Sequence, residues 1–251
     1  MVVLAAAVLL VINTPGWPRF RSTFLDLQYG WQVLPKIAEG LWLNVRLMVI
    51  CEIGILIVAM VVALLRTLRG PVWFPLRALA IAYTDLFRGL PLILTLLLLG
   101  FGIPSLRLDW LPTSALFWGC FALIVTYGAY VSEVLRAGIE SVHPSQRAAA
   151  RSLGLNHAKT MQFVVVPQAV RRVMPPLLND LVALTKDTGL ISILGVAYDA
   201  VLNAKIETAQ SFNYTPYVVA GVLFVLITIP LTRLTDWVSR RQGWTGSGGT
   251  V

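Results

Sequence analysis

Long apolar stretches recur along the whole chain, and short polar stretches separate them. Residues 47–65 hold a single charged side chain, while residues 89–103, 110–132 and 208–232 hold none. A helix needs roughly 20 mostly apolar residues to cross the hydrocarbon core of a membrane. The pattern therefore predicts several transmembrane helices, and it gives no sign of a separate soluble domain between them.

Polar breaks position the predicted helices in the first half of the chain. We expect residues 13–40, which mix Pro, Trp, Arg and Asp, to form an extramembrane connection before a first crossing at about residues 41–65. A second apolar region, residues 76–103, is expected to be a kinked or broken helix because helix-breaking and charged residues interrupt it. These residues are Asp85, Arg88, Gly89 and Pro91. A third crossing is expected at about residues 116–135.

The second half of the chain contains two more apolar regions. The run after Pro167 is broken by Asp180, Lys186 and Asp187, and it predicts one crossing and a partial one. A last crossing is expected at about residues 217–238. The sequence thus predicts an all-α polytopic membrane bundle of five core helices.

The two ends of the chain differ in composition from this core. Residues 1–12 are apolar but, at about 1.5 Å per residue, too short to cross alone. They are either the end of a longer helix or a partial crossing, and both alternatives stay open. The tail, residues 242–251, is rich in glycine and is expected to be flexible.

Composition and charge agree with a membrane protein. Hydrophobic residues make up 57% of the 251 positions and charged residues 13%, about half the charged share of a soluble domain. The basic residues behind the net charge of +8 lie between apolar stretches rather than along one polar face, which indicates membrane topology and not a nucleic-acid surface. Basic residues follow positions 65, 135 and 238, so the positive-inside rule places these ends and the C-terminus in the cytoplasm.

Few residues suggest catalysis or metal binding. The two cysteines, Cys51 and Cys120, both lie inside apolar runs, where a thiol usually behaves as a small core residue. With two histidines in the whole chain and no Cys/His cluster, the sequence supports neither a metal centre nor a catalytic site.

The longest base-rich segment is predicted to form a compact knob on the cytoplasmic side. Ser145 is a plausible N-terminal cap, three alanines favour a short helix, and Gly154 is a plausible stop. Asn156 could then cap a second short helix that extends to about Phe163. Small side chains on such a knob would let a partner approach closely. The alternative is an amphipathic loop that lies on the lipid surface.

The spacing within residues 148–167 resembles the ATPase-binding loop of bacterial type I ABC importer permeases. The pattern of that loop is Glu-Ala-Ala, three residues, Gly, nine residues, Ile, any residue, Leu-Pro. Ala148 stands where the family usually has Glu, and valines replace the Ile and Leu. The coupling residues that the resemblance implies are Ala148, Ala149, Ala150, Arg151, Gly154, Leu155, Lys159, Val164 and Pro167.

Other motifs resemble the polar amino-acid branch of the same family. They are the segments Phe87-Arg88-Gly89-Leu90-Pro91, Glu133 to Ile139, Pro167-Gln168-Ala169 and Leu184 to Thr188. Together the resemblance implies a transmembrane domain over residues 38–241, with the coupling loop at 144–163. Residues 1–37 form an N-terminal apolar segment and connection, and residues 242–251 form a cytoplasmic tail.

The resemblance implies a transport subunit rather than an enzyme. We expect a multi-pass protein of the bacterial inner membrane, surrounded by lipid, that translocates a polar amino acid. Its expected partners are a second permease subunit, a cytoplasmic ATPase dimer and an extracytoplasmic solute-binding protein. Because the chain has no Walker pattern, ATP and Mg are expected in the ATPase and no cofactor in this chain.

Charged residues inside the apolar runs are the candidates for a substrate pathway, because such charges are costly in a membrane. The candidates are Glu52, Asp180, Lys186 and Asp187, with interhelical salt bridges as the alternative. Asp85 and Arg88 are three residues apart and are expected to pair along their own helix, beside the kink at Gly89 and Pro91. Glu133 and Arg136 are expected to be positioning residues.

Three further alternatives remain at this stage: a permease for another small solute, a passive channel, and a membrane-embedded enzyme. The sequence does not distinguish glutamate, glutamine, histidine and basic amino acids as substrates. It also does not distinguish a homodimer from a heterodimer.

Overall fold

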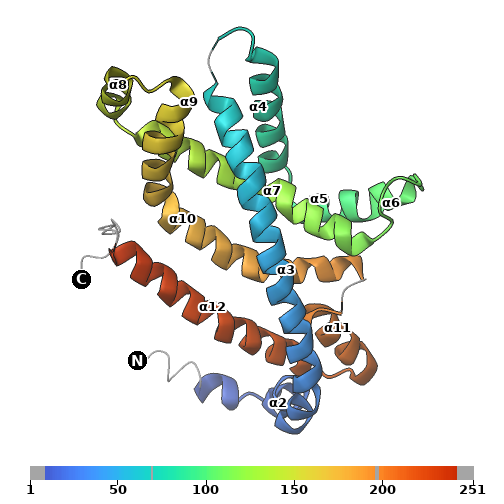
Figure 1. Cartoon of the computed structure of the whole chain (residues 1–251). Coiled ribbons are helices and arrows are strands. Elements are labelled where there is room, and N and C mark those ends of the chain that lie inside the picture. The colour runs from blue at the N-terminus through green and yellow to red at the C-terminus, as the bar shows by residue number, and fades with distance from the viewer. Residues whose placement is uncertain (1–8, 69, 196–197, 242–251) are drawn as a thin grey trace.

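The structure is a computed structural model that describes residues 9–68, 70–195 and 198–241. Most of these residues are helical, and no strand occurs among them. Figure 1 shows the arrangement of the elements, which are α2 (Trp17–Phe24), α3 (Leu27–Thr67), α4 (Phe74–Gly89), α5 (Leu92–Leu97), the π-helix η1 (Leu98–Gly102), α6 (Ile103–Ser105), α7 (Ala115–Ser141), α8 (Pro144–Ser152), α9 (His157–Thr160), the π-helix η2 (Met161–Val165), α10 (Val166–Asp187), the 3₁₀-helix η3 (Thr188–Leu194), α11 (Ala200–Ser211) and α12 (Thr215–Arg241). The predicted tail, Arg69 and most of the predicted N-terminal apolar segment lie outside the described residues.

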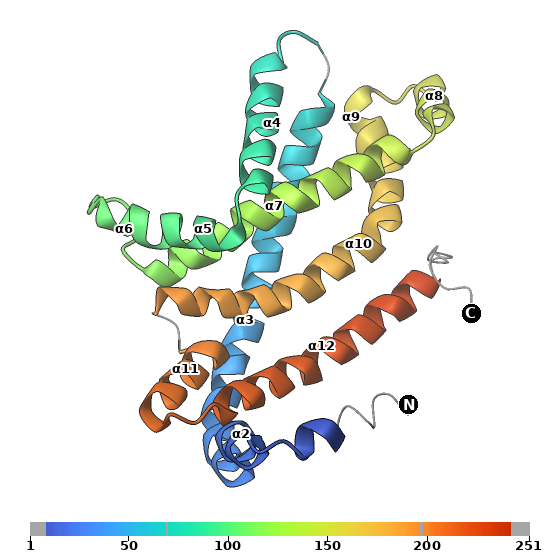
Figure 2. The same ribbon diagram turned by 180° about the vertical axis from the view of Figure 1, so that it is seen from behind.

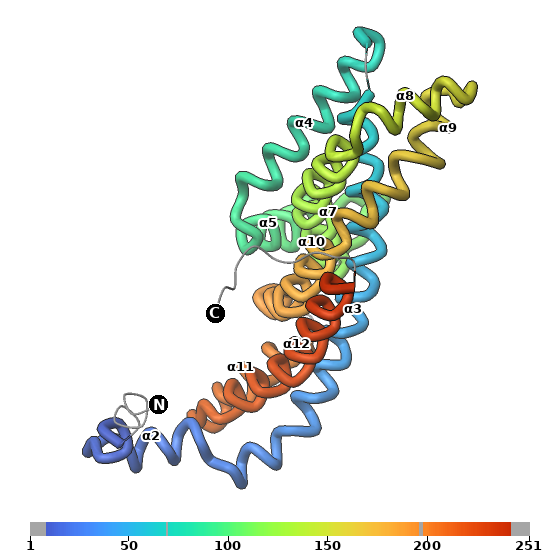
Figure 3. The backbone as a smooth tube through the Cα atoms, turned by 90° about the vertical axis from the view of Figure 1, so that its left-hand side faces the viewer, coloured from blue at the N-terminus to red at the C-terminus, as the bar shows by residue number. Residues whose placement is uncertain are grey.

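Helix α3 extends along most of the length of the bundle (Figure 3). It begins at Leu27, where the Asp26 carboxylate accepts a hydrogen bond from the Tyr29 N–H at 3.0 Å, and it continues through Pro35. The predicted start near residue 41 is therefore wrong. The polar residues of this segment belong to a helix that is already capped at Asp26, and Pro35 does not end it.

The predicted break in the second apolar region is confirmed. Helix α4 ends at Gly89, and α5 begins at Leu92 after Pro91, with an angle of 107° between the two helices. Leu90 and Pro91 have extended backbone dihedral angles, and proline cannot donate the hydrogen bond that would continue α4.

The main core lies where α3, α7 and α10 pack together. It is built from aliphatic side chains such as Ile55, Leu123 and Leu184, each of which is fully buried. In Figure 2, α7, α10 and α12 slant in the same direction, and α3 crosses them. Helix α7 is longer than predicted and ends at Ser141, so its charged last turns stay helical.

A polar junction attaches α11 to α3. The buried Asp199 caps α11 by accepting a hydrogen bond from the Leu202 N–H at 2.8 Å, and the Asn44 amide donates to its second oxygen at 3.2 Å. Nearer the start of α3, the Lys36 ammonium lies 2.6 Å from the Glu207 carboxylate. These contacts fix the position of α11 beside α3.

Length and composition identify three membrane-crossing helices among the described residues, in the segments Trp17–Thr67, Ala115–Ser141 and Thr215–Arg241. The bent pair α4 and α5–α6 adds a fourth if it is one span. Helix α10 does not pass this test, because Arg171, Arg172, Asp180, Lys186 and Asp187 give it a polar face. The structure therefore confirms a multi-helix membrane bundle. Helix length and composition identify three or four crossings among the described residues, compared with the five core helices that the sequence predicts.

Candidate functional site

The base-rich segment forms two short helices that project from one end of the bundle (Figures 1 and 2). We call residues 143–163 the knob. Its first helix, α8, is capped by His143, whose Nδ1 accepts a hydrogen bond from the Ser145 N–H at 3.2 Å. The expectation that Ser145 is the cap is wrong by two residues, because Pro144 occupies the first helical position and the imidazole takes the capping role.

The turn between the two short helices depends on Gly154. Its φ of +81° lies in the left-handed region, where a residue with a Cβ is strained. The Leu155 N–H donates to the Ala150 carbonyl at 3.2 Å across this turn, and Asn156 then caps α9 by accepting from the Lys159 N–H at 2.9 Å. The predicted roles of Gly154 and Asn156 as stop and cap are confirmed.

The outer surface of the knob combines small, basic and large apolar side chains. Ala148, Ala149, Arg151 and Lys159 are exposed, whereas Ala150 is buried at 4% exposure. Leu153 and Phe163 are 83% and 63% exposed, which is unusual for large apolar residues beside so many charges. Sequence analysis used these two residues only as part of the segment and missed them as candidate contacts. The available signal was that both are large apolar residues within the base-rich segment.

Helix α9 does not end near Phe163 as predicted. It continues without a break through η2 into α10, with Val165 fully buried and Pro167 in the first turn of α10. Pro167 cannot donate a backbone hydrogen bond, and the π-helix η2 ends two residues before it, so the hydrogen bonding departs from the α-helical pattern there while the backbone stays helical. The knob is therefore joined by continuous helical backbone to Asp180 and Asp187.

Three of the four predicted pathway residues come together around Tyr127. The Tyr127 hydroxyl donates a hydrogen bond to Asp187 Oδ2 at 2.6 Å, and Glu52 and Asp180 lie within electrostatic range of the same hydroxyl. Glu52 also interacts electrostatically with Asp180, whose Oδ2 atom is buried and has no hydrogen-bond partner among the described residues. We call Glu52, Asp180 and Asp187 the acidic cluster. Tyr127 was not predicted, because a tyrosine in an apolar run carries no distinctive pattern.

Lys186 is separate from this cluster. Its side chain is exposed and lines a hollow of about 500 Å³ together with Lys205 and Phe224. None of the three acidic-cluster residues lines that hollow. The structure therefore divides the four predicted pathway residues into three carboxylates and one lysine in different surroundings.

Glu133 on α7 joins three helices through ion pairs. It pairs with Arg66 at the end of α3, and its other oxygen lies 2.9 Å from Arg136 Nη2. Arg88 Nη1 approaches Glu133 at 3.9 Å, whereas the ion pairs of the described residues do not include Asp85 with Arg88. The expected pair within α4 is replaced by contacts between helices, because the end of α4 lies against α7.

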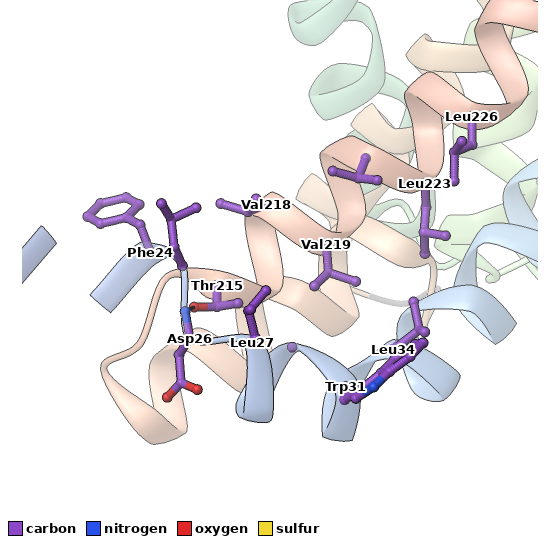
Figure 4. A pocket seen from close by; sticks show the side chains of 13 residues that line it. Phe24, Asp26, Leu27, Trp31, Leu34, Thr215, Val218, Val219, Leu223 and Leu226 are labelled. Atoms are coloured by element: carbon purple, nitrogen blue, oxygen red, sulfur yellow. Dashed lines mark hydrogen bonds between the residues drawn. The ribbon is translucent and has the colours of Figure 1, made fainter. Parts of the chain in front are cut away.

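Another hollow, of about 550 Å³, lies between the start of α3 and α12 and is shown in Figure 4. Trp31 and Leu34 on α3 line it together with Val219 and Leu223 on α12. Its one acidic residue, Asp26, already caps α3. This lining cannot compensate the charges of an amino acid, so the hollow is not a candidate substrate site.

The described residues contain no group of three or more His, Cys, Asp or Glu side chains that could hold a metal ion. Cys51 and Cys120 are both free thiols, and the Cys51 Sγ lies 3.9 Å from the Cys120 carbonyl oxygen.

Comparisons with known proteins agree with this arrangement. A family described as "binding-protein-dependent transport system inner membrane component" matches residues 55–244. The arginine transport system permease protein ArtQ of Bacillus subtilis is 33% identical over 224 residues, which cover 86% of this chain and 97% of the relative. The glutamate transport system permease protein GluC of Corynebacterium glutamicum is 32% identical over 207 residues, which cover 78% and 90%.

Solved structures give the same result for the fold. The crystal structure of an amino acid ABC transporter with histidines has a TM-score of 0.76 at 29% identity and covers 86% of this chain and 98% of that chain. The MetNI methionine ABC transporter has a TM-score of 0.67 at 15% identity, which bears on the fold alone. Because the family match covers most of the sequence, this chain belongs to the binding-protein-dependent transport system inner membrane components, the permease subunits of ABC importers, in which a separate subunit hydrolyses ATP.

Proposed function

We propose that this chain translocates a polar amino acid into a bacterial cell and that the knob transmits the movement of a separate ATPase dimer. The observation that carries this proposal is the continuous helical backbone from Asn156 to Asp187. About 30 residues at 1.5 Å per residue give a path of roughly 45 Å along the helix axis, and this path bends as it runs from the knob into the bundle (Figures 1 and 2). A push on the knob would therefore move the acidic cluster.

The acidic cluster supports an amino acid as the transported solute. Glu52, Asp180 and Asp187 are half-buried carboxylates on the helices of a membrane protein, and they need a positive charge to compensate them. The α-ammonium group of an amino acid supplies one, and a basic side chain supplies a second. We therefore infer that Glu52 and Asp180 receive the ammonium group, and that basic amino acids are favoured over acidic ones.

The names of the similar proteins are compatible with this substrate class. Relatives are named for arginine and for glutamate, and the solved structure is described with histidines. A permease for another small solute is the main alternative. A passive channel or a membrane-embedded enzyme needs no ATPase partner, so neither function accounts for the knob.

The remaining partners follow from the same proposal. A second permease subunit, identical or paralogous, would complete the pathway, and an extracytoplasmic solute-binding protein would deliver the amino acid. ATP and Mg would bind to the ATPase. The chain would lie in the inner membrane with its C-terminus in the cytoplasm, because the last turns of α3 and α12 carry Arg66 and Arg240, and the base-rich knob follows α7.

Copurification from detergent with candidate ATPase subunits tests the coupling role. The native chain is compared with Gly154→Arg, which puts a large cation and a Cβ at a residue with φ of +81° on the exposed knob. We expect the native chain to retain the ATPase and the variant to lose it.

The matched control is Gly195→Arg, because Gly195 also has a positive φ, +68°, and also has open space around it, but lies outside the knob. This control should keep the ATPase. The coupling role is refuted if folded Gly154→Arg binds as well as the native chain, or if the native chain retains no ATPase under conditions that preserve a known importer.

A further inference from the structure

A basic hollow of about 800 Å³ separates the knob from the ends of the membrane helices. Its walls come from the last turn of α3, the start of α4, the end of α7, and helices α8 and α9 with the start of η2. We call it the basic pocket and define it by its positively ionisable residues, which are Arg66, Arg77, Arg147, Arg151 and His157. Glu140 is the one carboxylate in its lining.

The charges of this pocket are not balanced from within. Glu140 lies 2.6 Å from Arg136 Nη1 and so already pairs with a cation that does not line the pocket. Arg66 is the one basic residue of the pocket with an ion pair in the described part of the chain, to Glu133. Four positively ionisable side chains therefore share a confined space without an acidic partner among those residues.

Hydrogen bonding in the pocket is also incomplete. Arg147 donates through Nη2 to the Ile139 carbonyl at 2.6 Å, while its Nε is buried and has no partner among the described residues. Arg77 donates through Nη1 to the Leu68 carbonyl at 3.0 Å. A buried guanidinium N–H without an acceptor costs free energy, and an anionic oxygen is the acceptor that a guanidinium prefers.

We propose that the basic pocket binds the phosphate of an anionic phospholipid headgroup. Cations alone would serve a soluble phosphate equally well, but the pocket also has apolar walls at Leu68, Val142 and Met161. It lies at the ends of α3 and α7, which cross the membrane, and the centroid of the exposed Phe74 ring lies 5.8 Å from the guanidinium carbon of Arg77 in the pocket lining. Basic pockets between membrane helices on the cytoplasmic side are typical sites for such headgroups.

The bound phosphate would join two parts of the molecule. Arg147, Arg151 and His157 belong to the knob, whereas Arg66 and Arg77 belong to the end of α3 and the start of α4. One headgroup that contacts both sets would hold the knob against the bundle. Binding itself does not depend on the transport function proposed above.

Native mass spectrometry of the delipidated full chain tests this proposal. The probes are phosphatidylglycerol, cardiolipin, phosphatidylcholine and inorganic phosphate. The pocket variant is Arg147→Gln with Arg151→Gln, and the control is Arg240→Gln with Arg241→Gln, which removes the same charge from the end of α12. We expect the pocket variant to bind the anionic lipids about 25-fold more weakly, because each of the two Arg residues near such a headgroup contributes roughly a factor of five.

The controls separate a specific site from general attraction. The Arg240 and Arg241 variant should bind anionic lipid within about twofold of the native chain, and Arg147→Lys with Arg151→Lys should retain most of the binding. Equal weakening in the pocket and control variants, or equal binding of phosphatidylcholine, overturns the proposal. Inorganic phosphate that binds as tightly as the lipids overturns the assignment to lipid.

A second measurement does not require any variant. A phosphatidylglycerol probe with a photoreactive group in its headgroup should label peptides from residues 64–78 and 139–161 of the native chain. Labelling elsewhere only, or labelling that disappears when the ATPase partner is added, overturns the proposal. In the latter case the pocket belongs to the contact with the ATPase.

Discussion

At the scale of single residues, the acidic cluster is the feature that most needs a ligand. Glu52 lies on α3, whereas Asp180 and Asp187 lie on α10, and Tyr127 on α7 provides one hydrogen bond to them. A carboxylate in a membrane interior is costly without a cation or several hydrogen bonds. The cluster is therefore suited to a transient positive partner, which is what a transported amino acid provides.

This arrangement predicts the effect of removing two of the charges. Glu52→Gln with Asp180→Asn should lower the uptake of arginine or lysine by at least about a hundredfold, because each of the two charge-assisted contacts contributes about 1.5–3 kcal/mol. Uptake is measured with labelled amino acids in cells that also express the ATPase and the binding protein. The control is Asp85→Asn, an exposed carboxylate on α4. Equal uptake by both variants would remove the cluster from the pathway.

A close contact between backbones at Gly40 gives a second prediction. A Cβ at Gly40 would lie 2.5 Å from the Asp199 carbonyl carbon and 2.6 Å from the Ala200 nitrogen. Gly40→Ala should therefore destabilise the protein by about 1–3 kcal/mol, because α11 must move away from α3. Thermal unfolding in detergent measures the loss.

Gly221→Ala is the matched control, since Gly221 lies within α12 and a Cβ added to it would meet nothing within 4 Å. Alanine at such a helical position is neutral or stabilising by up to about 1 kcal/mol. If the two variants unfold at the same temperature, the contact between α3 and α11 is less rigid than the structure indicates.

Many of these charged residues could be predicted from the sequence, but the residues that they contact could not. Glu52, Asp180 and Glu133 stand out because a charge in an apolar run is rare. That Arg88 approaches Glu133 rather than Asp85 depends on how α4 packs against α7, which spacing along one helix cannot show. Asn44 and Asp199 were missed for the same reason, because 155 residues separate two polar groups that meet only in the folded chain.

At the scale of helices, local signals predicted breaks better than continuity. Gly89 and Pro91 marked a real bend, and Gly154 marked a real turn. Sequence analysis also expected a break near Phe163 and a polar connection before residue 41, and both segments are helical. Polar residues and an internal proline do not end a helix whose backbone hydrogen bonds can continue past them, and packing against neighbouring helices decides the outcome.

The junction around Glu133 holds three helices together and predicts a stability effect. Glu133→Gln removes the charge that pairs with Arg66 and Arg136, and it should cost about 1.5–3 kcal/mol because the Glu133 side chain is only 18% exposed. Thermal unfolding in detergent, followed by circular dichroism, measures this change.

Glu140→Gln provides the comparison on the same helix. Its side chain is 59% exposed and pairs with Arg136 alone, so the expected cost is under about 1 kcal/mol. Equal costs for the two variants would show that Glu133 does not stabilise the junction beyond an ordinary surface ion pair.

At the scale of the whole molecule, the two ends of the bundle carry different chemistry. The knob lies at one end, and α11 lies toward the other, as Figures 1 and 2 show. The basic pocket is lined by residues of the knob and so lies at the same end. The proposed function requires the first end to face the ATPase in the cytoplasm and the second to face the binding protein outside. The proposed function therefore depends on the orientation of the whole chain in the membrane.

Site-directed labelling tests this orientation. Ser152→Cys on the knob and Ser211→Cys at the end of α11 both replace exposed serines. The two natural cysteines react little, because Cys51 is buried and Cys120 is half-buried in the bundle. A membrane-impermeant maleimide should label Ser211→Cys in intact spheroplasts, because that position would face outward. It should label Ser152→Cys only after the membrane is permeabilised.

A third labelling position, outside the knob, tests the orientation independently of Ser152. Arg240→Cys is exposed at the end of α12, and the positive-inside rule places it on the same side as Ser152. It should therefore behave like Ser152→Cys. If Arg240→Cys and Ser152→Cys are both labelled from outside, the chain is inverted and the knob cannot meet a cytoplasmic ATPase. If they are labelled from opposite sides, an odd number of crossings separates them, whereas the proposal requires an even number. The side of Ser211→Cys then identifies the helix that does not cross: it is α12 if Ser211→Cys and Arg240→Cys are labelled from the same side, and α10 if Ser211→Cys and Ser152→Cys are.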